Sequence, residues 1–190
     1  MKPTFKQVTK TRYVQLVSEL AAEIFVQHYT KLTPKVAAAL AERYQSDVET
    51  DEQIHSGAIN YFLIYLGSRA VGYFALDLGP AGALCLRRLF LAADARGQGI
   101  GRSVVAYAQK LAEGDGRSRL YLKVWARDLQ AEAFCKKCRF RKAETVPAEL
   151  LPGVSEGGIG LVYLPAFVCC LLGVFSRKIT RLLHGEMHNI

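Results

Sequence analysis

The sequence has few cysteines, and their arrangement excludes a disulfide framework. The 190-residue chain contains five, an odd number that includes the adjacent Cys169 and Cys170. Small disulfide-stabilised domains carry even numbers at regular spacings, so reduced thiols are expected. The first residues, MKPTFKQVTKTRYV, also lack the apolar run of a secretory signal. Both absences predict a cytoplasmic protein.

Acidic residues are scarce as well. Asp and Glu number 17 against 25 Lys and Arg, which leaves a formal net charge of +8. Such a balance predicts an anionic partner, which could be a phosphate-rich cofactor, nucleic acid or an acidic membrane surface. Nucleic acid is disfavoured because the sequence shows no basic patch interleaved with aromatic residues. The chain length and 51% apolar residues fit one folded domain.

Hydrophobic periodicity predicts helices first, then antiparallel strands, then a strand–helix–strand–helix segment. The expected helices cover residues 14–29, 34–45, 51–56, 100–113 and 128–138. The expected strands cover residues 60–66, 70–78, 83–91, 119–125, 140–146 and 158–168. This order indicates an α/β (α+β) domain with a mixed sheet.

The most specific motif is ARGQGIGRS, residues 95–103, between a predicted strand and a predicted helix. Such a junction offers unpaired backbone N–H groups and the positive end of the helix dipole. Together these features bind anions. Alternating glycines allow close approach to the backbone, and Arg96 and Arg102 add charge. Pyrophosphate is the expected guest, and a glycine-rich turn with solvated arginines is the alternative.

Two other phosphate loops do not fit this stretch. A Walker A loop requires Gly-Lys-Ser/Thr, but Gly101 is followed by Arg102 and Ser103. The dinucleotide pattern GxGxxG requires a third glycine, but Arg102 and Val104 occupy the two possible positions.

The loop resembles that of the GNAT superfamily of N-acetyltransferases. RGQGIG, residues 96–101, satisfies the Arg/Gln-x-x-Gly-x-Gly/Ala pattern of that family's acyl-CoA loop. LRRLFLAADA before it resembles the family's fourth strand, and AEAFCKKCRF resembles its "A-x-x-x-Tyr-x-x-x-Gly-Phe" helix. The resemblance spans residues 8–146. It implies a mostly antiparallel sheet with splayed central strands and helices on both faces.

The resemblance also implies acetyl-CoA as co-substrate and no metal. The backbone of the fourth strand would hold the pantetheine, and the loop would hold the pyrophosphate. The implied binding residues are Leu89, Phe90, Leu91, Arg96, Gly97, Gln98, Gly99, Ile100, Gly101, Arg102, Ser103 and Asp128. A primary amine, from a small molecule or from a protein N-terminus or lysine, would attack acetyl-CoA directly in a ternary complex. The protein is expected to be a monomer or a homodimer.

Several positions depart from the family pattern where catalytic groups are usual. Cys135 stands in place of the tyrosine that protonates the leaving thiolate, and is the candidate acid. Cys85 stands where many members have a glutamate, which leaves Asp77 and His28 as candidate bases. A surface carboxylate and a helix-face imidazole are the alternative interpretations of those two residues.

Two further substitutions affect the cofactor-side helix. Asp128 replaces a frequent asparagine, and Arg139 replaces the glycine that ends the helix in a left-handed turn. Keeping that turn with arginine would cost roughly 1 kcal/mol. Together the departures leave open, as an alternative to an active enzyme, a catalytically weak or inactive acyl-CoA-binding protein, for which the C-terminal segment leaves membrane association open as well.

The C-terminal region has two interpretations. Residues 157–176 contain 20 residues without a charge, followed by basic residues, as in a terminal membrane anchor. The fold still needs a last strand, which residues 158–168 supply if Pro165 lies at an edge or bulge. We therefore expect a GNAT domain at 1–168 and a basic amphipathic tail of unknown role at 169–190, with membrane association not favoured.

A zinc site is not expected. Cys135 and Cys138, with His184 and His188, have the internal spacings of a Cys₂His₂ site. However, 45 residues separate the two pairs, far more than a zinc finger uses.

Overall fold

The computed structural model describes residues 1–28, 34–79, 82–117, 119–125, 128–151 and 154–163. Within them a seven-stranded sheet has the order β1-β2-β3-β4-β5-β7-β6. The strands are β1 (Thr4–Gln7), β2 (Asn60–Leu66), β3 (Arg69–Leu78), β4 (Leu84–Leu91), β5 (Leu120–Trp125), β6 (Arg141–Leu151) and β7 (Val154–Tyr163). The helices are α1 (Thr11–His28), α2 (Pro34–Gln45), α3 (Asp47–His55), α4 (Ile100–Gly114) and α5 (Leu129–Lys137).

Antiparallel pairing dominates the sheet, and the pairs β2–β3, β3–β4 and β6–β7 are joined by short connections. The exception among the described strands is the parallel pair β4 and β5, which the helix α4 connects. A parallel pair needs such a crossover, whereas β2 and β3 are joined by a tight turn at Gly67. The mixed, mostly antiparallel sheet predicted from the sequence is confirmed.

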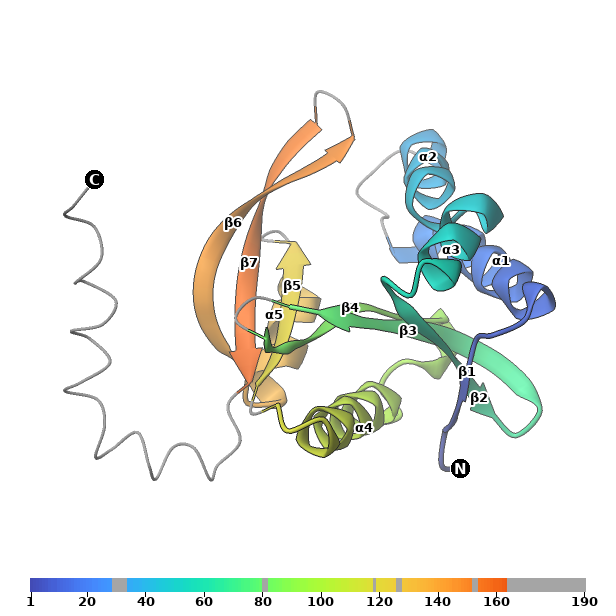
Figure 1. Ribbon diagram of the computed structural model, residues 1–190. Coiled ribbons are helices and arrows are strands. Elements are labelled where there is room, and N and C mark those ends of the chain that lie inside the picture. The colour runs from blue at the N-terminus through green and yellow to red at the C-terminus, as the bar shows by residue number, and fades with distance from the viewer. Residues whose placement is uncertain (29–33, 80–81, 118, 126–127, 152–153, 164–190) are drawn as a thin grey trace, which may run out of the picture.

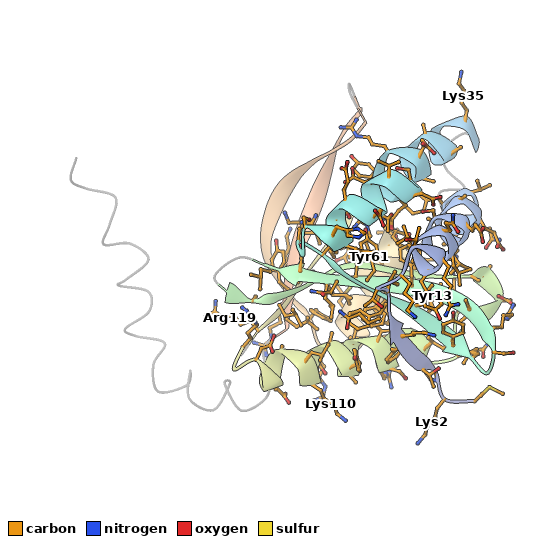
Figure 2. The ribbon with its side chains drawn as sticks, turned by 45° about the vertical axis from the view of Figure 1, so that its right-hand side comes forward. Lys2, Tyr13, Lys35, Tyr61, Lys110 and Arg119 are labelled. Atoms are coloured by element: carbon orange, nitrogen blue, oxygen red, sulfur yellow. The ribbon has the colours of Figure 1, made fainter. Side chains whose placement is uncertain are left out.

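Helices cover both faces of the sheet, as expected, with α1 to α3 on one side and α4 on the other (Figure 1). Strand β2 shows why both faces bury apolar residues. Tyr61 and Leu63 pack under α1, whereas Phe62 and Ile64 point to the opposite cluster with Val104 of α4. In Figure 2 Tyr61 lies between sheet and helices, while Lys35 and Lys110 project outward.

Most predicted elements are confirmed, although several boundaries differ: α1 begins at Thr11, not at residue 14, and β7 begins at Val154, not at residue 158. Helix α3 begins at Asp47, not at residue 51, because Ser46 caps it by accepting a hydrogen bond from the Glu49 amide at 3.3 Å. Strand β1 was not predicted, since TFKQ has a single apolar residue and becomes a strand only by pairing with β2. Strand β6 extends five residues further than predicted, to Leu151, because it pairs with β7.

The expected C-terminal tail and residues 164–168 of the last predicted strand lie outside the described residues, as do His184 and His188. Among the residues that the structure describes, no helix is long and apolar enough to cross a membrane. The same residues contain no group of three or more His, Cys, Asp or Glu side chains that could hold a metal ion.

Candidate functional site

The central strands β4 and β5 splay apart and open a cleft. They pair only where Leu84 to Leu86 face Leu120 to Leu122. Beyond this point β4 pairs with β3 through Leu89, Phe90 and Leu91, and β5 pairs with β7. The edge of β4 that faces the opening is therefore unpaired among the described residues, and such an edge can bind an extended ligand through backbone hydrogen bonds.

The main part of the cleft has a volume of about 420 Å³ and lies between β4, the glycine loop and α5. Nine of the residues predicted to bind the cofactor line it: Leu89, Phe90, Leu91, Arg96, Gly97, Gly99, Ile100, Gly101 and Arg102. The structure thus brings strand and loop together around one cavity, as the resemblance implied.

The glycine loop presents a run of unbonded backbone amides. Gly97 and Gly99 have φ of 76° and 79°, a left-handed conformation that an L side chain rarely adopts. The first backbone bond of α4 runs from the Ser103 amide to the Gly99 carbonyl, at 3.1 Å. The amides from Gly97 to Arg102 donate to no acceptor within the described structure. With the positive end of α4 behind them, these amides have the arrangement with which helix N-termini bind anions.

Gly101 is required for a different reason than the sequence suggested. A Cβ at Gly97 or Gly99 would meet nothing within 4 Å, so both positions face open space. A Cβ at Gly101 would lie 3.0 Å from the ring of Phe134. Gly101 therefore lets α4 pack against α5, whereas the other two shape the loop.

Several side chains of the loop donate hydrogen bonds to nearby backbone carbonyls and so stabilise the loop conformation. Arg96 lines the cleft, and its Nε donates to the Leu91 carbonyl at 2.9 Å, which ties the loop to the end of β4. Gln98 donates to the Asp94 carbonyl at 2.7 Å, and the Ser103 hydroxyl donates to the Gly99 carbonyl at 3.3 Å. Neither Gln98 nor Ser103 is among the described residues that line the cleft.

Helix α5, which the sequence placed on the cofactor side, supplies one wall of the main cleft, through residues that were not among the predicted binding residues. The lining residues are Gln130, Ala131, Phe134 and Lys137 of the helix and its C-cap, Cys138. These positions follow the spacing i, i+1, i+4, i+7 and i+8, which places them on one helix face. That periodicity is the sequence signal from which these lining residues could have been predicted. Lys137 adds a positive charge to the cleft, whereas Lys136 pairs with Glu132 at 2.8 Å.

A smaller lobe of about 170 Å³ adjoins the main cleft and shares Leu89, Phe90, Ala131 and Phe134 with it. Asp128 and Cys135 line this lobe. The Asp128 carboxylate accepts a hydrogen bond from the Ala131 amide at 2.9 Å. Asp128 therefore caps α5, a role in which aspartate and asparagine are equivalent.

Cys135 is placed in the cleft but is a weak acid. Its side chain is almost completely buried, and burial, followed by the nearby Cys138, raises the pKa of its thiol to about 12. Burial, followed by Asp77, likewise raises the pKa of Cys85 to about 12. Both thiols therefore stay protonated at neutral pH and are poor proton donors. The role of Cys135 as catalytic acid stays a prediction.

Of the two candidate bases, the described structure places only the side chain of Asp77. The Asp77 carboxylate accepts a hydrogen bond from Arg87 Nε at 2.6 Å. Arg87 lines the smaller lobe, but Asp77 lines neither lobe. His28 is the last residue of α1, and its side chain lies outside the described structure. Both assignments stay predictions.

Comparisons with known proteins agree with this geometry. The model of the acetyltransferase (GNAT) family matches residues 21–140. A search of curated proteins finds no relative. Among solved structures, the PaiA N-acetyltransferase of Thermoplasma acidophilum in complex with coenzyme A is 16% identical, with a TM-score of 0.71 over 86% of this chain and 99% of its own.

Two more solved structures show the same fold. An acetyltransferase of Thermus thermophilus is 22% identical, with a TM-score of 0.60 over 86% of this chain and 97% of its own. A mutant of the spermidine N-acetyltransferase SpeG of Vibrio cholerae is 14% identical, with a TM-score of 0.61 over 86% and 94% of the two chains. Since the family model covers more than half of the chain, and β4 splays away from β5 before it leads into the glycine loop, this protein belongs to the GNAT family of acetyltransferases.

Proposed function

We propose that the protein transfers the acetyl group of acetyl-CoA to a primary amine by direct attack within a ternary complex. The observation that carries the proposal is the continuous cleft from the unpaired edge of β4 to the unbonded amides of the glycine loop. The neighbour from Thermoplasma acidophilum was solved with coenzyme A, which supports the same ligand here.

The cleft suggests a role for each of its walls. The amides from Gly97 to Arg102 would hold the pyrophosphate, with charge from Arg96 and Arg102. The backbone of Leu89 to Leu91 would pair with the pantetheine amides, and a β4 N–H would stabilise the oxyanion that develops on the thioester carbonyl. The cleft thereby aligns the thioester for an amine that enters from the smaller lobe.

The proposed step needs two proton transfers. The amine nitrogen attacks the thioester carbon, the carbon–sulfur bond breaks, and the sulfur leaves as a thiolate. Asp77 or His28 would take the proton from the attacking amine, and Cys135 or a water would give one to the thiolate. A neutral amine must first form, since most amines are protonated at pH 7.

A second candidate is a protein that binds acyl-CoA with weak catalysis or none. The favouring observation is Cys135, a buried thiol of high pKa where the resemblance places a catalytic tyrosine. Thiol release in the presence of an amine panel separates the two candidates. Binding of acetyl-CoA without release by any amine favours the second.

The first test is the melting temperature with and without acetyl-CoA. A ligand at 100 times its dissociation constant stabilises the folded state by about 2.7 kcal/mol, which is a shift of several degrees. The loop is tested by Gly99→Leu, whose side chain would occupy the phosphate position.

Gly116→Leu is the matched control, because Gly116 has φ of 70°, open space around its Cβ position and a place beyond the far end of α4. Both variants carry similar backbone strain and should lose similar stability. Only Gly99→Leu should lose the response to acetyl-CoA. An equal response in the two variants would contradict the assignment of the glycine loop as the pyrophosphate site.

A further inference from the structure

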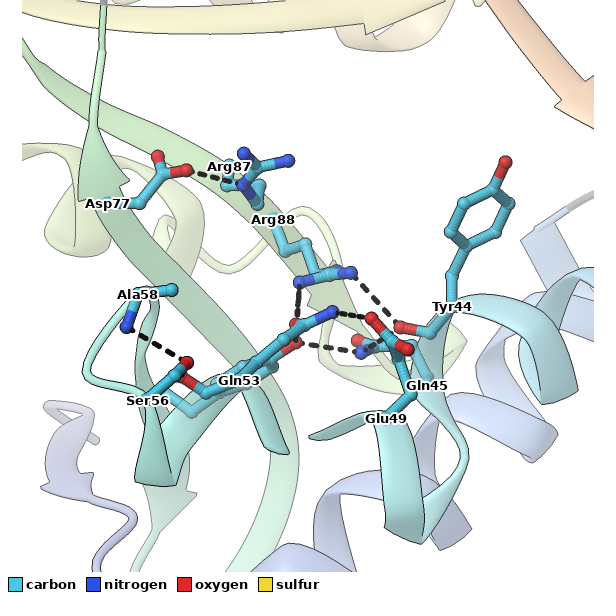
Figure 3. A network of polar contacts seen from close by, with 10 residues as sticks. Tyr44, Gln45, Glu49, Gln53, Ser56, Ala58, Asp77, Arg87 and Arg88 are labelled. Atoms are coloured by element: carbon cyan, nitrogen blue, oxygen red, sulfur yellow. Dashed lines mark hydrogen bonds and ion pairs between the residues drawn. The ribbon is translucent and has the colours of Figure 1, made fainter. Parts of the chain in front are cut away.

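Arg88 occupies an unusual position on β4. Its half-buried side chain reaches from the central strand to α2 and α3. One terminal nitrogen, Nη1, donates to Gln53 Oε1 at 3.1 Å and to the Tyr61 hydroxyl. The other, Nη2, donates to the Tyr44 carbonyl at 3.0 Å. Figure 3 shows the guanidinium between Gln53 and Tyr44.

All of these acceptors are neutral. Burial raises the pKa of Tyr61, even against the effect of Arg88, so its hydroxyl stays protonated at physiological pH. The carboxylate of Glu49 bonds to the Gln53 amide and not to Arg88. Within the described part of the chain no carboxylate contacts the Arg88 guanidinium. A half-buried cation without a counter-charge is costly unless a ligand supplies one.

The hydrogen-bond inventory of Arg88 leaves a donor pair available. A guanidinium has five N–H groups, and the three bonds above use three of them. The Nε–H and one N–H on Nη2 have no acceptor among the described residues. Two neighbouring N–H groups of this kind bind a carboxylate with two parallel hydrogen bonds.

The surroundings of Arg88 are positive. Arg88 lines the smaller lobe, together with Arg87 and Lys123. Asp77 neutralises Arg87, whereas Lys123 forms no ion pair with any described residue. The lobe wall also carries the negative charge of Asp128, which caps α5, so among the described lining residues three cationic side chains stand against one carboxylate. An acceptor with several cationic amines would meet like charge in this lobe, and an acceptor with an anionic group would meet opposite charge.

We propose that the acceptor is a small amine that also carries a carboxylate, as an amino acid does, and that Arg88 binds this carboxylate. The inference rests on the proposed acetyl transfer and names the acceptor class for the same site. It sets this chain apart from the spermidine N-acetyltransferase of Vibrio cholerae, whose named substrate is a polyamine. The carboxylate would complete the hydrogen bonds of Arg88 and orient the amine toward the thioester.

Arg88 also connects β4 to the helices, so its removal could disturb the fold. The test variant is therefore Arg88→Lys, which keeps the charge and loses the paired donors. The control is Tyr61→Phe, which removes one hydroxyl from the same network and leaves the guanidinium in place. Melting temperature with and without acetyl-CoA reports folding and cofactor binding in both variants.

The experiment measures thiol release from acetyl-CoA with the L-amino acids, their C-terminal amides and spermidine. For the wild type, kcat/KM for the best amino acid should exceed that for its amide by about tenfold to a hundredfold, the loss expected when a charged hydrogen-bond partner is missing. Arg88→Lys should raise KM for the acid and reduce this ratio at least several-fold. Tyr61→Phe should largely keep it.

The outcomes distinguish a wrong acceptor class from a wrong assignment of acetyl-CoA as the co-substrate. If acetyl-CoA shifts the melting temperature but acids and amides are used equally, or spermidine is preferred, or no member of the panel releases thiol, the acceptor inference is wrong. If Arg88→Lys leaves the ratio of kcat/KM for the amino acid to that for its amide unchanged, Arg88 does not bind the carboxylate. If acetyl-CoA produces no shift in the wild type, the proposed function fails, and the acceptor inference fails with it.

Discussion

Replacement of Arg139 by glycine should stabilise the protein. Arg139 has φ of 66°, and it is the one non-glycine residue with positive φ among the described residues. It follows α5, whose end is closed by two backbone bonds, from the Arg139 amide to the Lys136 carbonyl and from the Phe140 amide to the Cys135 carbonyl, both 3.0 Å. This is a Schellman motif, in which glycine is usual at the left-handed position.

The size of the effect follows from three contributions. A left-handed conformation costs an L residue about 1–2 kcal/mol, which glycine would relieve. Glycine loses more backbone entropy on folding, which offsets about 0.5–1 kcal/mol. The Arg139 side chain is exposed, so its removal costs little. The net gain is about 0.5–1 kcal/mol, or a rise of about 1–4 °C in melting temperature for a chain of this length.

The assay is thermal unfolding followed by circular dichroism, with Arg139→Ala as the control. Alanine removes the same side chain but keeps the Cβ that causes the strain, so it should give no gain. The response to acetyl-CoA should be unchanged in both variants, because Arg139 does not line the cleft. The reasoning is refuted if the glycine variant is no more stable than the alanine variant.

Three further predictions concern the cleft and its buried thiols. Gly72→Ala should destabilise the fold by about 3 kcal/mol and weaken acetyl-CoA binding, because its Cβ would lie 2.2 Å from the Phe90 carbonyl oxygen of β4; an unchanged urea midpoint would contradict this. Cys135→Ala should lower kcat less than tenfold, since a true general acid is worth about 10²–10⁴; a larger loss at unchanged stability would assign Cys135 that role. Between pH 9 and about 12 the thiols of Cys85 and Cys135 ionise when unfolded but not when folded, so stability should fall with rising pH by up to about 1.4 kcal/mol per pH unit for each thiol. Alanine at both positions should flatten that decline, and an equal slope would refute the burial argument.

Sequence reasoning was strongest where local chemistry carries the signal. The loop at 95–103 was recognised because alternating glycines and flanking arginines are meaningful in sequence alone. The family pattern marks position 139 as a left-handed position usually held by glycine, and the φ of Arg139 shows that the turn is kept. The start of α3 was missed because Ser46 acts as a cap only in its extended conformation, with φ of −60° and ψ of 160°.

Reasoning from sequence was weaker where residues meet over long distances. The network around Arg88 joins β4 to Gln53, which lies 35 positions earlier in the chain, and to Tyr44, which lies 44 positions earlier. No local sequence pattern marks this network. The face of α5 that lines the cleft had a visible period, but the period does not say whether it meets a core or a cavity. The position of Asp77 against Arg87 likewise depends on the register between β3 and β4.

The sequence by itself determined the fold class and the family, and it predicted the anion-binding loop, because these depend on spacing and on residue chemistry within a few positions. Only the tertiary structure decided which charges face the cleft and which are paired elsewhere. It separates Lys137, which lines the cleft, from Lys136, which binds Glu132, and it leaves the Arg88 guanidinium without a contacting carboxylate among the described residues. The physical reason is that strand register and helix packing set the distances between charges that are remote in the chain, and the free energy of a buried charge depends on those distances.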